Sequence, residues 1–166
     1  MRKQLQSRHL SRTTKFTIYK TLIRPVLLYG SEVWVLTRRE ENQLLVFERK
    51  VLRTICGPKN ENGVFRRRYN FELQREFDSP SVINVVKTSR LRYAGHMIRR
   101  PEDLPQKAIF IARPQGTRRQ GRPKSRWADG VNSDSRAIGA LDWTNRARDR
   151  ERWKVFLRQA LTISWL

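Results

Sequence analysis

Basic side chains are the residues of this 166-residue sequence with the clearest chemistry. The chain carries 36 Lys and Arg against 15 Asp and Glu, a formal net charge of +21. An excess of this size favours polyanionic partners, because phosphates attract Lys and Arg by charge and by counterion release. The candidate nucleic-acid-binding residues fall in three clusters, Arg66, Arg67 and Arg68, then Arg92, His96 and Arg99, then Arg118, Arg119, Arg122, Lys124 and Arg126. The last helix is a further basic segment expected to bind a polyanion.

The acidic residues do not form a pattern typical of catalysis. Phosphoryl-transfer sites hold two metal ions about 4 Å apart between converging carboxylates. Glu40-Glu41 instead falls in the first turn of an expected helix, where acids favour the positive end of the dipole, and Glu102-Asp103 falls in a proline-flanked segment. One Cys and two scattered His are too few for a zinc site. We therefore expect no catalytic residue, no metal, no cofactor and no primer extension by this chain.

The segment from residue 113 to residue 126 combines basic residues with glycines and prolines, and it has no acidic residue. Such a composition disfavours a regular helix and predicts a flexible phosphate-binding loop, which Trp127 would anchor to the core. Gly121-Arg-Pro-Lys124 is close to the core of an AT-hook, but Gln120 stands where that motif has its first Arg. This difference argues against minor-groove specificity.

The elements that must position these residues are predicted to be helices. Apolar residues recur at helical spacing, with little alternation of period two, and the fold expected is an all-α irregular helical bundle with little or no sheet. The expected helices are Thr13–Tyr29 with a kink at Pro25, a helix from the Thr37 capping box to Gly57-Pro58, Glu72–Phe77, a helix opened by Ser79-Pro80 that runs to Arg99, Trp127–Ile138 and Thr144–Leu161.

Glu48 conflicts with this pattern, because it falls in the middle of an apolar face formed by residues such as Leu44, Phe47 and Val51. An unpaired carboxylate is costly to bury. Two interpretations follow from the sequence: a partly exposed Glu at the edge of a thin interface, or a buried Glu paired with a basic residue, with Arg24 as the first candidate.

Two further helical faces are predicted. In the first helix, Phe16, Tyr19, Leu22 and Val26 are expected to be apolar core positions. In the helix that ends at Arg99, Thr88 is expected on the polar face, together with the basic cluster of that helix.

Five sequence blocks, in order, resemble the C-terminal part of non-LTR (LINE-type) retrotransposon reverse transcriptases. The blocks are Ile18–Trp34, Phe47–Arg53 with Gly57-Pro58, Arg66–Asn70 with Glu72-Leu73, Arg90–His96, and Gly121–Trp127. The resemblance implies a thumb-like helical region and the segment that follows it, both of which grip template RNA, primer or target DNA. The catalytic palm, the endonuclease and the downstream zinc knuckle of these proteins have no counterpart in the sequence.

The expected function is therefore RNA and DNA binding through the phosphate backbone, without a small-molecule substrate or a membrane, in the nucleus or the cytoplasm. An independent basic chromatin or interaction module with an AT-hook-like loop is the alternative. The expected parts are a thumb-like region at 1–60, a linker and basic helical segment at 61–112, the basic loop at 113–126 and a C-terminal helical pair at 127–166.

Overall fold

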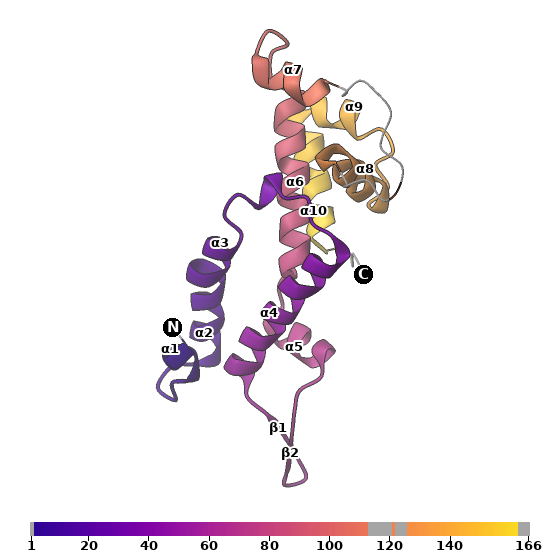
Figure 1. The fold of residues 1–166 in the computed structure, drawn as a ribbon. Helices are drawn as coiled ribbons and strands as arrows, with labels where there is room; N and C mark the ends of the chain where they lie inside the picture. The colour runs from indigo at the N-terminus through magenta and orange to yellow at the C-terminus, as the bar shows by residue number, and fades with distance from the viewer. Residues whose placement is uncertain (1, 113–120, 122–125, 163–166) are drawn as a thin grey trace. The chain divides into compact units, whose positions relative to one another are not determined.

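The structure, a computed structural model, describes residues 2–112, 121 and 126–162, and it confirms the all-α prediction (Figure 1). The helices are α1 (Arg2–Gln6), α2 (Arg12–Ile18), α3 (Arg24–Leu27), α4 (Arg38–Cys56), α5 (Asn70–Phe77), α6 (Val82–Ile98), α7 (Pro105–Ile111), α8 (Trp127–Ala137), α9 (Trp143–Arg148) and α10 (Arg150–Thr162). Two short strands, β1 (Lys59–Glu61) and β2 (Val64–Arg66), form a hairpin. The helices described include none that is long and apolar enough to span a membrane.

The chain divides into two compact units. The first unit comprises Met1–Tyr29 and Leu36–Ile83, and the second comprises Gly30–Val35 and Asn84–Leu166. The sequence places its expected boundaries after residues 60, 112 and 126, whereas the boundary after Ile83 lies within α6. Each unit has its own apolar cluster.

The helix expected over Thr13–Tyr29 contains a π-helical turn, Tyr19–Ile23, between α2 and α3. Pro25 has no N–H and crowds the carbonyl four residues before it, which favours a wider turn, and the Arg24 N–H donates to the Tyr19 carbonyl, five residues back. The extra residue shifts the phase of the buried face. Leu22 and Val26, predicted as core, are therefore exposed, Val26 at 78%, whereas Leu28 is buried.

The Thr37 capping box predicted for α4 is present. The Thr37 hydroxyl accepts from the Glu40 N–H at 3.4 Å, and the Glu40 carboxylate accepts from the Thr37 N–H at 2.7 Å. Gly57 ends the helix with a φ of 68°. The buried face is rotated from the predicted one: Leu45, Glu48 and Leu52 lie inside, and Phe47 is exposed.

Glu48 is only 2% exposed, which confirms its burial, but the prediction of Arg24 as its hydrogen-bonding partner is wrong for the residues described. The carboxylate accepts from the Tyr19 hydroxyl at 3.0 Å and from the Val82 N–H at 2.9 Å, so it caps the first turn of α6. Arg24 instead donates to the Pro80 and Ser81 carbonyls at 2.6 and 2.9 Å. These two carbonyls lie just before α6, which begins at Val82 and not at the predicted Pro80.

The polar turn expected near residue 60 is a β-hairpin. Asn62 and Gly63 both have positive φ, at 53° and 86°, which is typical of a two-residue type I′ turn. The Asn-Gly pair is the sequence signal that predicts this hairpin. The adjoining side chains form an ion network, in which Arg66 donates to Glu61 at 2.6 and 2.7 Å and to Glu72 at 2.7 and 2.9 Å.

This network predicts an acid-sensitive contribution to stability. Hydrogen bonds from Arg66 and then Lys59 lower the pKa of Glu61 from 4.5 to about 2, and Arg66 also holds the pKa of Glu72 well below its ordinary range. A lowered folded-state pKa stabilises the fold above the unfolded value and ceases to do so as the pH falls through the folded value. We expect Glu61→Gln to lower the thermal midpoint near pH 6 and to have a much smaller effect near pH 2, where the Glu61 carboxylate is about half protonated in the folded protein. Exposed Glu102→Gln is the control, and equal shifts for the two variants would contradict the prediction.

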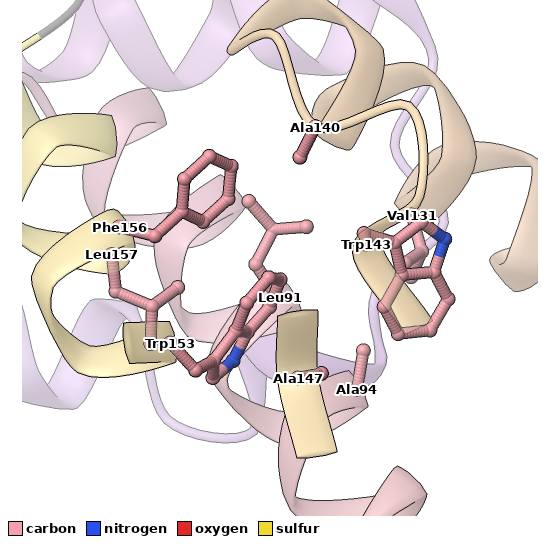
Figure 2. Close-up of a cluster of buried hydrophobic side chains, with 9 residues drawn as sticks. All are labelled: Leu91, Ala94, Val131, Ala140, Trp143, Ala147, Trp153, Phe156 and Leu157. Atoms are coloured by element: carbon pink, nitrogen blue, oxygen red, sulfur yellow. The ribbon is translucent and has the colours of Figure 1, made fainter. Parts of the chain in front are cut away.

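The second unit is built around α6, which is buried over most of its circumference from Val86 onward. Figure 2 shows its cluster, in which Leu91 and Ala94 of α6 pack with side chains of α8, α9 and α10, among them Val131, Trp143 and Trp153. Thr88 is buried rather than exposed on a polar face, whereas Arg92 and His96 of the same predicted face are exposed. On α8, a Cβ at Gly130 would lie 2.8 Å from the Arg90 guanidinium, so Gly130 allows Arg90 to reach Asp134.

Two features of the second unit differ from the expected helices. The segment before residue 112 contains α7, and the Lys107 ammonium of that helix donates to the Ile98 and Arg100 carbonyls at the end of α6. The helix expected over Thr144–Leu161 is two helices, α9 and α10. Asp149 separates them, because its carboxylate accepts from the Glu151 and Arg152 N–H groups and starts α10.

Candidate nucleic-acid interface

A groove of about 770 Å³ lies between α6 and α10 in the second unit. The two helices lie side by side in Figure 1, and they run antiparallel, because Asn84 at the start of α6 donates to the Leu161 carbonyl at the end of α10. Gly95 permits this packing. A Cβ at that position would lie 2.1 Å from the Trp153 indole nitrogen, so only glycine allows the two helices to approach so closely.

Cationic side chains from both helices line this groove. The cations lining it are Arg92 and Arg99 of α6 and Arg150, Lys154 and Arg158 of α10, with His96 beside them. All except Arg99 are exposed. The floor is apolar, formed by Trp153 and Leu157. Cationic rims over an apolar floor suit a chain of phosphates better than a small charged substrate.

Arg99 and Arg150 bring like charges together at one end of the groove. Burial, and then the charge of Arg150, lower the pKa of Arg99. The Arg99 guanidinium is also held in place, because it donates to the Ala147 carbonyl at 2.6 Å. An anion placed here would relieve the repulsion between the two guanidinium groups.

The structure brings the predicted residues Arg92, His96 and Arg99 together on one face of α6 and adds three cations of the last helix, a segment that was predicted as basic but without named residues. Arg150, Lys154 and Arg158 follow i, i+4, i+8 spacing, which is the sequence signal that could have identified them. Lys154 is only loosely paired, with Glu151 at 3.8 Å. His96 accepts a hydrogen bond from Arg100 at 3.2 Å, and Glu32 also lines the groove.

The three consecutive arginines of the first unit separate into different roles. Arg66 is bound by Glu61 and Glu72, and Arg68 donates to the Gly57 carbonyl at 3.1 Å and to Glu76 at 2.6 Å. Their charges are therefore neutralised within the chain. Arg67 is exposed. The predicted cluster thus presents one exposed guanidinium and two that brace the hairpin against α5.

The basic loop falls mainly outside the described residues, including Arg118, Arg119, Arg122 and Lys124. Arg126 is exposed and immediately precedes α8. Trp127 is half-buried, and its indole N–H donates to the Glu32 carbonyl at 2.8 Å. Its ring meets those of Tyr93 and Phe110 edge to face, with ring centroids 6.0 and 5.6 Å apart. The residue that directly follows the basic segment is therefore packed against other aromatic side chains.

Several carboxylates have structural partners. Asp134 is buried and bonds to Arg90 on α6, at 2.9 Å to Nε, and Glu48 caps α6. Within residues 2–112, 121 and 126–162, no group of three or more His, Cys, Asp or Glu is placed to hold a metal ion.

The described fold and groove define a basic, all-α protein whose exposed cations suit a polyanion. The chain is 24% identical over 160 residues to an uncharacterized transposon-derived protein of Caenorhabditis elegans, a match that covers 90% of this chain and 56% of that protein. The chain thus spans about half the length of this curated relative. No protein-family model and no solved structure matches the chain. The similarity supports a transposable-element origin.

Proposed function

We propose that the chain binds RNA and DNA through their phosphate backbones, and that the groove between α6 and α10 is the main contact surface. The observation that carries the proposal is the set of exposed cations along both rims, at Arg92, Arg150, Lys154 and Arg158. Repulsion between neighbouring cations raises the free energy of the free protein, and a bound polyanion removes this repulsion.

The finer proposal concerns origin. We infer that the chain corresponds to the thumb and post-thumb region of a retrotransposon RNA-directed DNA polymerase. The five ordered sequence blocks and the similarity to a transposon-derived protein support this inference. In this role the chain grips template RNA or target DNA without catalysing nucleotide transfer, and it acts in the nucleus or the cytoplasm.

A salt series tests the groove. We expect the variant in which Arg92, Arg150, Lys154 and Arg158 are all Gln to bind duplex DNA and RNA more weakly. Its plot of log Kd against log salt should lose about 0.7 to 0.9 of slope for each contact removed, roughly 3 in total. Arg99 is left unchanged, because its bond to Ala147 supports the fold.

A matched variant separates groove contacts from net charge. Arg8, Arg38, Arg39 and Arg75 are exposed cations of the first unit, and changing all four to Gln removes the same charge. This control should keep most of the wild-type slope, and equal losses in the two variants would refute the groove as the contact surface. Comparison of A·T-rich with G·C-rich duplexes tests the alternative, since an AT-hook module would lose its A·T preference with Arg122→Gln.

A further inference from the structure

The first unit presents an exposed aromatic stack beside the hairpin. The rings of Tyr69 and Phe71 lie parallel, with centroids 5.8 Å apart and an interplanar angle of 11°. The Arg66 guanidinium covers Tyr69 at 4.4 Å from the ring centroid. Tyr69 and Phe71 are nevertheless 57% and 62% exposed, so the structure holds a planar stack at the protein surface instead of in a core.

This stack is held in place before any ligand arrives. Arg66 is bound by Glu61 and Glu72, and the Tyr69 N–H donates to Glu72 at 2.8 Å. The next residue, Asn70, accepts from Arg53 of α4 at 2.6 Å. Since the rings are already positioned, binding of a planar ligand to the stack requires little further ordering of these side chains.

Basic residues lie near the stack in addition to Arg66, whose own charge Glu61 and Glu72 neutralise. Arg53 lies beside it through Asn70, and Arg67 is exposed between Arg66 and the aromatic residues in the chain. Burial, and then the charges of Arg67 and Arg49, lower the pKa of Arg53, so both of these cations act on the Arg53 guanidinium. Such a charge disfavours a basic or purely apolar protein partner and favours a polyanion.

We propose that this surface binds single-stranded nucleic acid, with an unpaired base stacked on Phe71 and neighbouring phosphates on Arg53 and Arg67. Bases present a flat π-face to aromatic side chains only when they are unpaired, so the surface selects single strands. The site is separate in sequence and in compact unit from the groove proposed above, and it does not depend on that groove.

Substitution of Phe71 tests the stacking. We expect Phe71→Leu, which keeps an apolar side chain but loses the ring, to bind a fluorescent oligothymidylate about tenfold more weakly than wild type. Phe71→Trp should retain wild-type affinity or exceed it. Phe65→Leu is the matched control, because Phe65 is 69% exposed on the neighbouring hairpin and should be neutral. Thermal midpoints near the wild-type value should show that each variant is folded.

An abasic oligonucleotide of the same length separates bases from phosphates. Loss of affinity in Phe71→Leu should disappear with this ligand, and the salt slope should be unchanged, because no charge is removed. Equal affinities of wild type and Phe71→Leu for the oligothymidylate would overturn the proposal, as would an equal loss with the abasic strand. The groove proposal would be refuted by a different result, an unchanged salt slope for duplex binding when Arg92, Arg150, Lys154 and Arg158 are all Gln. The two proposals can therefore fail independently.

Discussion

Replacing Gly95 by alanine is expected to lower the free energy of unfolding of the second unit by about 2 to 3 kcal/mol. Overpacking a core costs about 1 to 3 kcal/mol and occasionally more, and an approach of 2.1 Å puts this site at or above the top of that range, from which the better helix propensity of alanine subtracts up to about 1 kcal/mol. The added Cβ would lie 2.1 Å from Nε1 and 2.6 Å from Cδ1 of Trp153. Trp153 is 2% exposed and stacks on Phe156 at 5.1 Å, so it cannot move aside without disturbing the cluster in Figure 2.

The same substitution should weaken nucleic-acid binding, because it pushes α10 and its cations away from α6. A double-mutant cycle with Trp153→Leu identifies the cause. Leucine has no atoms in place of Nε1 and Cε2, two of the three indole atoms that meet the new Cβ, so Trp153→Leu should be less harmful in the Gly95→Ala background than in wild type. Chemical denaturation of the four proteins measures this coupling, and strictly additive losses would show that the clash is not with Trp153.

Glu48→Leu is expected to destabilise the first unit by about 3 kcal/mol. An isolated buried ion pair can often be replaced by apolar residues without loss. Glu48 differs, because leucine would leave two buried donors, the Tyr19 hydroxyl and the Val82 N–H, without an acceptor, at about 1 to 3 kcal/mol each. Burial, followed by the charge of Glu48, also raises the pKa of Tyr19, so the phenol stays protonated and remains a donor.

Glu48→Gln is the informative companion. Its amide oxygen can accept from Val82 while the Tyr19 hydroxyl turns to accept from the amide NH2 group, so we expect a loss of about 1 kcal/mol. Tyr19→Phe, which removes one of the two donors, should soften the effect of Glu48→Leu. Urea unfolding curves at neutral pH measure all three, and a neutral Glu48→Leu would mean that the capping bond to α6 contributes nothing.

Local signals in the sequence predicted much of the fold. Thr37 and Glu40 predicted the start of α4, and Gly57 predicted its end, because capping and chain reversal depend on residues within a few positions of one another. Asn62-Gly63 is a local signal of the same kind, because both residues adopt the positive φ that the hairpin turn requires. Two predictions were wrong because a long helix is interrupted. The π turn before Pro25 rotated the buried face of the first helix, and Asp149 divided the last helix into α9 and α10.

The sequence by itself determined the helical class, the start of α4 and the excess of positive charge, because each depends on composition or on neighbours along the chain. Only the tertiary structure decided what each charge does. Glu61, Glu72 and Glu76 neutralise Arg66 and Arg68, whereas the packing of α10 on Gly95 gathers Arg150, Lys154 and Arg158 beside Arg92. A guanidinium is free or bound according to which carboxylate lies within about 4 Å of it, and that distance is set by contacts between elements far apart in the chain.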